Sequence, residues 1–290
     1  MKIRVQRILQ QAELGSRRAC EEWIRQGRVA VNGQVARVGD VADPTVDVVT
    51  LDGERVTPKT QPRVYLALNK PPGVTTTLRD PHAERTVSDL IPDRFGRVFP
   101  VGRLDRESEG LLLLTNDGEL AHALMHPSSQ VPKVYDVWVQ GVPGHSHLDR
   151  IRRGIVFDDG MAKPDEVRLV SVRDHQARLR VTLHEGRKRE IRRLFFSIGH
   201  PVTRLVRIQY GPVRLEGLAP GEVRALTQRE VQDLKALIGL GKERTTNGHG
   251  LYRRQRQPGG QKHRSGESLS PKRPRYSFGH TRGNSERPHR

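Results

Sequence analysis

The chain has 290 residues, of which 51 are Lys or Arg and 33 are Asp or Glu, so its formal net charge is +18. This basic excess favours a polyanionic partner such as nucleic acid and argues against a small acidic metabolite as the sole ligand. A single cysteine, Cys20, excludes an internal disulfide framework and a Cys-rich zinc site. The sequence contains neither a signal-peptide core nor an apolar run of the roughly 20 residues that span a bilayer, so we expect a cytoplasmic protein.

The first 38 residues predict two short helices followed by a hairpin. Gly15 separates the two helices, and Ser16 is a typical N-cap for the second. The dipeptide Asn32-Gly33 tolerates the positive φ angles of a type I′ turn. The predicted elements are helices over 5–14 and 17–26 and strands over 28–31 and 34–38.

This N-terminal module is rich in arginine. Its run GSRRACEEWIRQGRVAVNG, residues 15–33, resembles the S4-type RNA-binding domain. The resemblance implies that residues 1–52 bind RNA phosphates, and the pattern alone also fits a helical hairpin with solvated arginines. The candidate RNA contacts are Arg17, Arg18, Arg25 and Arg28.

The polar, proline-containing stretch 53–63 predicts a connection to a larger domain over 64–240. In that domain apolar and polar residues alternate from Ala177 to His184, which is typical of a strand with one buried face. We expect an α+β domain built on a largely antiparallel sheet. Its predicted strands cover 64–69, 98–101, 111–115, 134–140 and 177–183, and its predicted helices follow Asp117, include 191–198 and begin after Thr227.

The arginines of the predicted helix over 191–198 lie at different positions relative to its apolar stripe. Ile191 and Phe195 belong to its apolar stripe, and Arg192 borders that stripe at about 100° from Ile191. Arg192 is therefore expected to pair with a partly buried carboxylate. Arg189 and Arg193 lie on the opposite side, free for phosphates.

The last fifty residues, 241–290, hold 13 Lys or Arg and only 3 Asp or Glu. With almost no aliphatic residues this tail cannot form a core, so we expect it to be disordered. Aromatic residues among its arginines favour RNA binding, and a solvating appendage is the alternative.

Several common chemical signatures are missing from the sequence. It has no GxGxxG and no GxxxxGK[ST], which argues against dinucleotide and P-loop nucleotide sites. His122 and His126 share a helix face without a further ligand cluster, so no metal site is predicted.

The run VGRLDRESEG, residues 101–110, is the candidate catalytic segment. Its Asp105 stands between Arg103 and Arg106, where a carboxylate should stay ionised and could act as a nucleophile or base. By itself this pattern is more typical of a solvated ion pair than of a catalytic group.

Two longer runs carry a second resemblance, VGRLDRESEGLLLLTNDGELAHALMHPSSQVPKVYDVWVQG and EGRKREIRRLFFSIGHPVTRLVRIQYG. They resemble the pseudouridine synthases that modify bacterial ribosomal RNA, in the branch with an S4-type domain. The resemblance covers residues 1 to about 240. It implies that Asp105 is catalytic, that Tyr135 packs on the target base, that Arg192 pairs with Asp105 and that Leu205 lines the base pocket.

The resemblance also implies the reaction, in which one uridine is flipped out of the RNA and isomerised without a cofactor. Asp105 could attack the ribose, stabilise its cation or remove a proton, and the sequence leaves these open. Arg103 would fill the vacated place in the RNA. The further candidate substrate contacts are Lys133, Arg187, Lys188 and Arg189.

The S4-type domain and basic tail favour 23S over 16S ribosomal RNA as substrate, either free or in pre-ribosomal particles, and we expect a monomer. Three alternatives stay open. They are a 16S-specific synthase, a non-catalytic ribosome-assembly factor, and an RNA N-glycosidase that uses Asp105 with Glu107 or Glu109.

Overall fold

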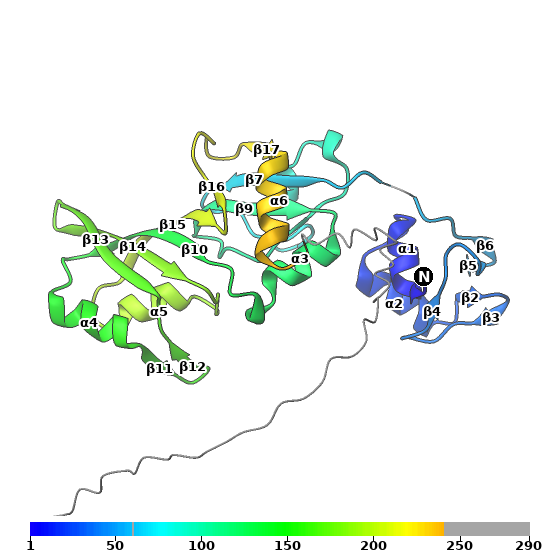
Figure 1. Cartoon of the computed structure of the whole chain (residues 1–290), viewed down its shortest axis with the longest axis horizontal. Coiled ribbons are helices and arrows are strands. Elements are labelled where there is room, and N and C mark those ends of the chain that lie inside the picture. The colour runs from blue at the N-terminus through cyan, green and yellow to red at the C-terminus, as the bar shows by residue number, and fades with distance from the viewer. Residues whose placement is uncertain (60, 241–290) are drawn as a thin grey trace, which may run out of the picture. The chain divides into compact units, whose positions relative to one another are not determined.

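The computed structural model describes residues 1–59 and 61–240, and the predicted tail lies outside the described residues. The N-terminal module combines two helices with short strands (Figure 1). Strands β1 and β4 pair with each other, and the other four form a sheet in the order β3-β2-β5-β6. The elements are α1 Val5–Gln11, α2 Arg17–Arg25, β1 Ile3–Arg4, β2 Val29–Val31, β3 Gln34–Val35, β4 Val41–Ala42, β5 Val49–Leu51 and β6 Glu54–Arg55.

The helix-helix-hairpin order predicted for this module is confirmed. The Ser16 side chain accepts a hydrogen bond from the Ala19 amide at 3.2 Å, as an N-cap does. Asn32 and Gly33 have φ angles of +51° and +83°, the left-handed pair that a type I′ turn needs. The first helix was predicted too long. It ends at Gln11 because the chain already turns at Glu13, whose φ is +63°.

The predicted connection over 53–63 also begins too early. Asp52 and Gly53 form a second tight turn with φ angles of +52° and +84°, which pairs β6 with β5. Val56 is buried in the core of the module. The first residues of the predicted connection therefore belong to the N-terminal module.

The larger domain is built on a nine-stranded sheet in the order β13-β14-β10-β15-β9-β7-β17, with β16 beside β15 and β8 beside β9. Every neighbouring pair is antiparallel except β15 and β9, which confirms the largely antiparallel α+β fold. The strands are β7 Tyr65–Lys70, β8 Phe99–Pro100, β9 Glu109–Thr115, β10 Lys133–Gln140, β13 Glu166–Arg173, β14 Gln176–Leu183, β15 Val202–Tyr210, β16 Val213–Arg214 and β17 Val223–Ala225.

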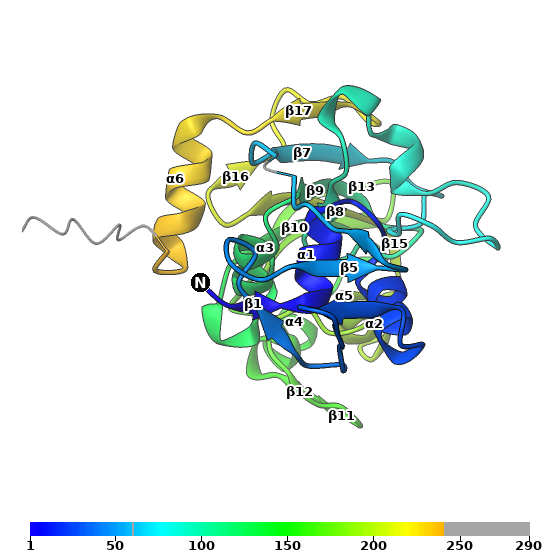
Figure 2. The same cartoon turned by 90° about the vertical axis from the view of Figure 1, so that its right-hand side faces the viewer.

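Four α-helices accompany this sheet, and Figure 2 shows α6 beside β7 and β16. The Asp117 side chain caps α3, and Thr227 with Glu230 forms the predicted capping box of α6. Helix α4 and the hairpin of β11 and β12 were not predicted from the sequence. The elements are α3 Gly118–Met125, α4 His145–Arg153, α5 Glu190–Phe196, α6 Gln228–Leu237, β11 Ile155–Phe157 and β12 Gly160–Ala162, with short 3-10 helices at Val87–Leu90, Asp93–Phe95 and Pro127–Ser129.

The two halves of the sheet are covered differently. Strands β7 and β9 are buried along nearly their whole length, because one face packs in the core that includes β10 and β14 while the other packs under α3 and α6. Strand β14 alternates buried and part-exposed residues, as its sequence predicts. We call β9, β7 and β17 the two-sided half and β13, β14, β10 and β15 the one-sided half. Within the described residues, no helix has the length and apolarity needed to cross a membrane.

Candidate active site

Asp105 lies in a loop between β8 and β9 that is fixed by its backbone. The neighbouring Leu104 is buried, and its carbonyl and amide both contact the hydroxyl of Thr76, at 2.7 and 3.3 Å. The Ser108 amide donates to the Asp105 carbonyl at 3.0 Å and closes a turn. The carboxylate of a part-exposed residue is thereby held on a backbone that has little freedom to move.

Lys70 lies beneath this loop and is fully buried. Its ammonium group donates to the carbonyls of Pro71 at 2.9 Å, Arg106 at 3.1 Å and Ser108 at 2.7 Å. Burial lowers its pKa to about 8, although the carboxylates around the loop oppose the shift. Lys70 thus ties the end of β7 to the residues on both sides of Glu107.

Gly110 joins the Asp105 loop to the one-sided half of the sheet. It pairs with Arg207 in the parallel contact of β9 and β15, and its φ is +98°. A Cβ atom at this position would lie 2.3 Å from the Arg207 carbonyl oxygen, so a side chain has no room. Glycine therefore allows the two strands to approach where the loop ends.

Tyr135 and Leu205 face the same core as the residues beside Asp105 and Arg192. Tyr135 shares its strand face with Val137 and Val139, as predicted, and pairs across to Val181. Val137 in turn pairs with Leu205 on β15. One hydrophobic cluster contains Leu104, Tyr135, Ile191 and Leu205. The fold therefore gathers four predicted segments that are far apart in the sequence.

Arg192 reaches the Asp105 loop from α5. Its guanidinium donates to the carbonyls of Glu107 at 3.4 Å and Val202 at 3.3 Å. Burial and the nearby Arg189 lower its pKa, and the carboxylates of Asp105 and Glu107 oppose this shift. Among the ion pairs within 4.0 Å in the described part of the chain, none joins Arg192 to Asp105. The direct ion pair that we expected is therefore not formed in this structure, because Arg192 binds the backbone of the loop.

Two buried polar atoms at this place have no hydrogen-bond partner within the described residues. They are the Nε of Arg192 and the Oγ of Ser108. Unpartnered buried polar atoms are uncommon in folded proteins, and a bound substrate can supply the missing partner. Both atoms belong to the segments that surround Asp105.

Arg193 and Arg187 are less available than the sequence suggested. Arg193 forms a two-pronged ion pair with Asp159, with both nitrogen to oxygen distances at 2.8 Å, and lies over the ring of Phe157. Arg187 binds Glu185 at 3.0 Å and the Asp159 carbonyl at 2.9 Å. The expectation that Arg193 is free for phosphates is wrong, since it anchors α5 to the hairpin of β11 and β12.

Of the other predicted substrate contacts, one side chain is engaged in a hydrogen bond within the protein and three are exposed to solvent. Lys133 is part-buried, donates to the His184 carbonyl at 2.7 Å, and has its pKa lowered to about 8 by burial and by Arg207. Arg103, Lys188 and Arg189 are exposed. No ion pair involves these three within residues 1–59 and 61–240.

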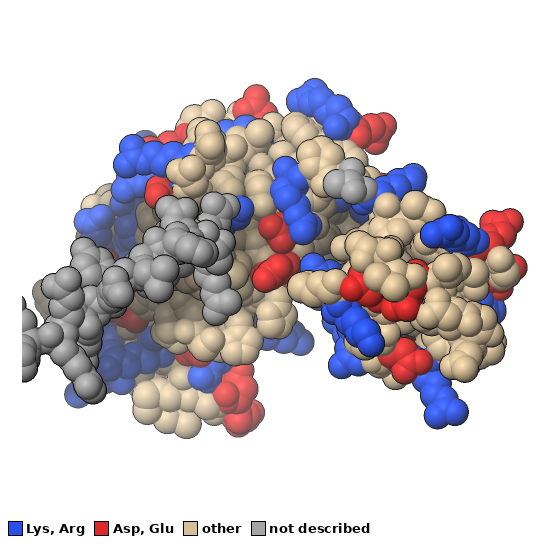
Figure 3. Space-filling view, turned by 45° about the vertical axis from the view of Figure 1, so that its right-hand side comes forward, with Lys and Arg blue, Asp and Glu red and all other residues tan. Residues whose placement is uncertain are grey.

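In the N-terminal module, local pairs hold several of the candidate cations. Arg17 binds Glu21 at 2.9 Å, Arg25 binds Glu22 at 3.0 Å and Arg28 binds Asp52. Exposed pairs of this kind contribute at most about 1 kcal/mol, so RNA phosphates can replace the carboxylates. The face in Figure 3 shows the same mixture, with Lys and Arg in separate groups and many of them next to Asp or Glu.

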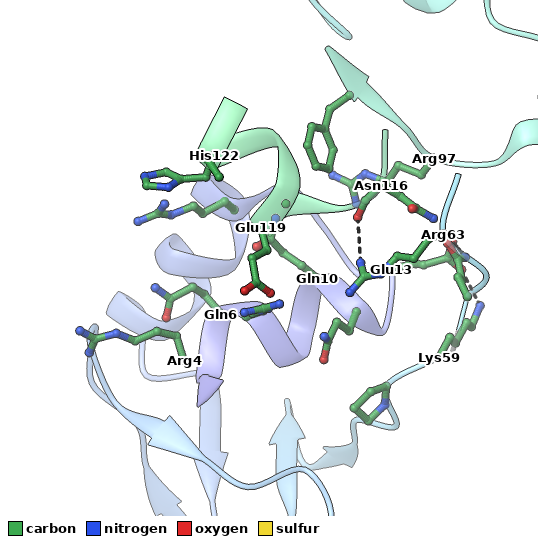
Figure 4. A pocket seen from close by; sticks show the side chains of 18 of the residues that line it. Arg4, Gln6, Gln10, Glu13, Lys59, Arg63, Arg97, Asn116, Glu119 and His122 are labelled. Atoms are coloured by element: carbon green, nitrogen blue, oxygen red, sulfur yellow. Dashed lines mark hydrogen bonds and ion pairs between the residues drawn. The ribbon is translucent and has the colours of Figure 1, made fainter. Parts of the chain in front are cut away.

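A pocket elsewhere in the molecule contains none of the predicted catalytic residues. Its lining comes from α1, the connection before β7 and the start of α3 (Figure 4). Helix α1 contributes Gln6 and Gln10, and α3 contributes Glu119 and His122. No group of three metal-binding side chains occurs among the residues that the structure describes.

Sequence reasoning missed the residues that hold the Asp105 loop in place. Lys70 lies just beyond the strand predicted over 64–69. The available signal was its position at the end of an apolar strand, directly before two prolines. Thr76 gave no signal, because its contact with Leu104 depends on the tertiary structure. Gly110 was part of the quoted motif, but its close approach to Arg207 could not be seen in the sequence.

Comparison with known proteins gives two matches to family profiles. The profile described as RNA pseudouridylate synthase matches residues 64–197. The S4 domain profile matches residues 3–48. The two predicted modules are therefore each similar to a known domain, in the predicted order.

Full-length relatives show the same similarity. An uncharacterized RNA pseudouridine synthase of Aquifex aeolicus is 45% identical over 242 residues, which cover 83% of this chain and 96% of that protein. The ribosomal large subunit pseudouridine synthase B of Bacillus subtilis is 39% identical over 241 residues, 82% of this chain and 98% of that protein. A crystal structure of a pseudouridylate synthase aligns with a TM-score of 0.57 and 28% identity, over 80% of this chain and 99% of that one.

Proposed function

The chain belongs to the RNA pseudouridine synthase family, and from this premise we propose that it converts one uridine of large-subunit ribosomal RNA into pseudouridine. The reaction is an isomerisation, so no group is gained or lost. The bond between ribose carbon 1′ and the base nitrogen breaks, the uracil turns, and carbon 5 of the base bonds to carbon 1′. The proton on carbon 5 then leaves for a base, and nitrogen 1 of the uracil gains a proton, so the overall composition is unchanged.

Asp105 is the group that acts on the ribose in this proposal. An ionised carboxylate can stabilise the cation that develops at carbon 1′, bond to it, or take the 2′ proton. The fixed backbone around Leu104 and Ser108 supports this role, because a catalytic group held in place loses little freedom when it reacts.

Tyr135, Leu205 and Arg192 complete the site. Tyr135 would stack on the flipped uracil, with its ring set by the strand face it shares with Val137. Leu205 would line the same pocket. Arg192 would bring its unpartnered Nε to the substrate or to Asp105 once RNA is bound. Exposed Arg103 is free to occupy the place in the RNA that the uridine leaves.

One observation carries this assignment. Four sequence segments, around Asp105, Tyr135, Arg192 and Leu205, meet at a single core cluster, and Arg192 contacts the backbone two residues from Asp105. This meeting of four segments that are far apart in the sequence supports a single site that uses all four.

The large-subunit assignment draws on the relatives in Bacillus subtilis and Xylella fastidiosa, both named ribosomal large subunit pseudouridine synthase B. We further propose that the N-terminal module targets the RNA and that the basic tail adds sequence-independent affinity for it. We also propose that the protein acts as a monomer in the cytoplasm, on ribosomal RNA that is either free or in pre-ribosomal particles.

Mapping of pseudouridines in ribosomal RNA from cells with and without this protein tests the function. One uridine of 23S RNA should lose its modification and regain it when the gene is returned. The variant Asp105→Asn keeps the size of the side chain and removes its charge. In single-turnover assays it should bind the RNA transcript normally and lose at least about a thousandfold in rate.

The other outcomes separate the alternatives. A lost modification in 16S RNA would show a small-subunit synthase, and free uracil in the reaction would show an N-glycosidase. If the Asp105→Asn variant restored every effect of the protein in cells, a non-catalytic assembly factor would be the answer. If it kept a tenth of the wild-type rate, Asp105 would not be the catalytic group.

A further inference from the structure

Phe196 at the end of α5 is unusual among the aromatic residues of this protein. Its relative exposure is 74%, and it is the one exposed aromatic side chain among the described residues. Its neighbour Phe195 is completely buried in the core. Packing of α5 therefore explains Phe195 and leaves Phe196 without a structural role.

Phe196 lies on the same side of α5 as Arg192, the residue that contacts the Asp105 loop. At 100° per residue, it lies about 40° from Arg192 around the helix axis. Side chains on a helix lean toward its N-terminus, so Phe196 covers the turn that holds Arg192. Arg192 in turn contacts the Asp105 loop through the Glu107 carbonyl. An exposed ring thus stands one helical turn, about 6 Å, from a residue of the candidate active site.

The orientation of α5 is fixed by the contacts of Arg193 and of its buried residues. Arg193 is held by Asp159 on both of its terminal nitrogens and lies 4.7 Å from the centre of the Phe157 ring. Ile191 and Leu194 are buried in the core. With these contacts made, α5 cannot rotate to bury Phe196 without breaking them.

Charge around Phe196 favours nucleic acid as the occupant. Arg189 and Lys188 are exposed and form no ion pair within the described residues, so they are available to phosphates. Unpaired RNA bases stack on exposed aromatic rings, and cations beside the ring bind the backbone of the same strand. A protein partner that covered Phe196 would have to leave these cations unmatched or supply acidic groups.

We propose that Phe196 is a substrate-positioning residue, on which an unpaired base next to the target uridine stacks. The proposal rests on the function proposed above and extends it. Flipping the uridine removes the stacking partner of its neighbour, and the ring of Phe196 supplies a replacement surface close to Arg192. The contact would select targets in which the flanking nucleotide is free to unstack, such as those in loops.

The test uses the full-length protein and a transcript of the ribosomal RNA region that the wild type modifies. Phe196→Ala should raise the RNA concentration for half-maximal single-turnover rate about 5- to 100-fold, the range for loss of one base-aromatic stack. The rate at saturating RNA should change little. Phe196→Trp should restore the affinity. Val172→Ala, which removes an exposed apolar side chain from β13, serves as the matched control.

Abasic substitutions in the transcript identify the stacked base. With the wild-type protein, removal of the base at one position beside the target should weaken binding by the same factor as Phe196→Ala. In the Phe196→Ala variant that removal should have no further effect. If the variant binds as well as the wild type, or if every abasic position that weakens wild-type binding weakens the variant equally, the proposal is wrong. Absence of pseudouridine with the wild-type protein would instead overturn the proposed function.

Discussion

The two halves of the sheet in the larger domain differ in how far their strands are buried. In the two-sided half, β7 and β9 are enclosed on both faces and support the Asp105 loop through the buried Lys70. In the one-sided half, β14 alternates buried and part-exposed residues, and most of β13 is exposed. Tyr135 and Leu205 come from the buried face of this half.

The two halves therefore differ in how firmly they hold the groups that they carry. A loop fixed by buried contacts holds a carboxylate in a defined position, as catalysis requires. Helix α5, which contacts β15 of the one-sided half, instead leaves Phe196 exposed. The prediction from this comparison is that changes where β9 meets β15 and beneath the Asp105 loop change the free energy of unfolding strongly, whereas changes of exposed side chains change it little.

The largest effect is expected where β9 of the two-sided half pairs with β15 of the one-sided half. Gly110→Ala would place a Cβ against the Arg207 carbonyl at a φ of +98°, so the strands must separate. The free energy of unfolding should fall by about 4 kcal/mol, measured by urea unfolding. Gly199→Ala has a similar φ of +80° but open space around it, and should cost only about 1 kcal/mol. Equal losses in the two variants would show that the close approach is unimportant.

The second prediction compares adjacent arginines of α5. Arg192→Met removes the contact with the Asp105 loop and should lower the single-turnover rate about 100-fold, as loss of a charged donor at an active site does. Arg193→Met removes an anchor to Asp159 and should leave the rate near that of the wild type. A larger rate loss in the Arg193 variant would reverse our assignment of the two side chains.

The third prediction concerns pH. Burial lowers the pKa of Lys70 to about 8, whereas an unfolded lysine has a pKa of about 10.4. Between these values the unfolded chain binds more protons than the folded one, so stability rises with pH. Lys70 should contribute about 2 kcal/mol to the rise in unfolding free energy from pH 8 to 10.

Urea unfolding at pH 8, 9 and 10 measures this contribution. Lys70→Met should flatten the rise, and Lys133→Met should flatten it by a similar amount, because burial also lowers the pKa of Lys133 to about 8. Above pH 10 the sign reverses, since burial raises the pKa of Tyr65 and Tyr210 to about 12. An unchanged slope in the Lys70→Met variant would mean that this lysine is not desolvated.

The smallest effect is expected at an exposed side chain. Arg204 is exposed and pairs with Glu109 at 2.8 Å, across the strands that join the halves. Arg204→Ala should lower the unfolding free energy by less than about 1 kcal/mol and leave the rate unchanged. If Arg204→Ala lowered the free energy of unfolding as much as Gly110→Ala, an exposed ion pair would stabilise the pairing of β9 and β15 as strongly as the buried contact does. That result would contradict the comparison.

Local signals predicted most elements correctly. Caps at Ser16, Asp117 and Thr227 lie where their hydrogen-bonding groups suggested, since a cap depends on only a few neighbouring residues. Alternation along β14 likewise reflects one buried and one open face. Errors occurred where a polar turn concealed a strand, as at Asp52-Gly53, and where a helix carries only two apolar residues, as α4 does with Leu148 and Ile151.

For the site, the sequence predicted the principal residues and not their contacts. Asp105, Tyr135 and Leu205 came from the family resemblance, and the common core around them agrees with those roles. The contacts of Lys70 and Gly110 join residues far apart in the chain, so no local pattern could reveal them. The same reason explains Arg193, whose partner Asp159 lies in an unpredicted hairpin.

The parallel pairing of β9 with β15 has a consequence for synthesis on the ribosome. Asp105 leaves the ribosome long before Val206 and Arg207, which complete the sheet beside its loop. Strand β17 comes later still and covers the edge of β7. At the usual rate of roughly 5 to 20 residues per second, the nascent chain spends seconds with its aspartate in place and its neighbouring strand missing. We therefore expect the site to form late in synthesis, after nearly the whole described chain has emerged.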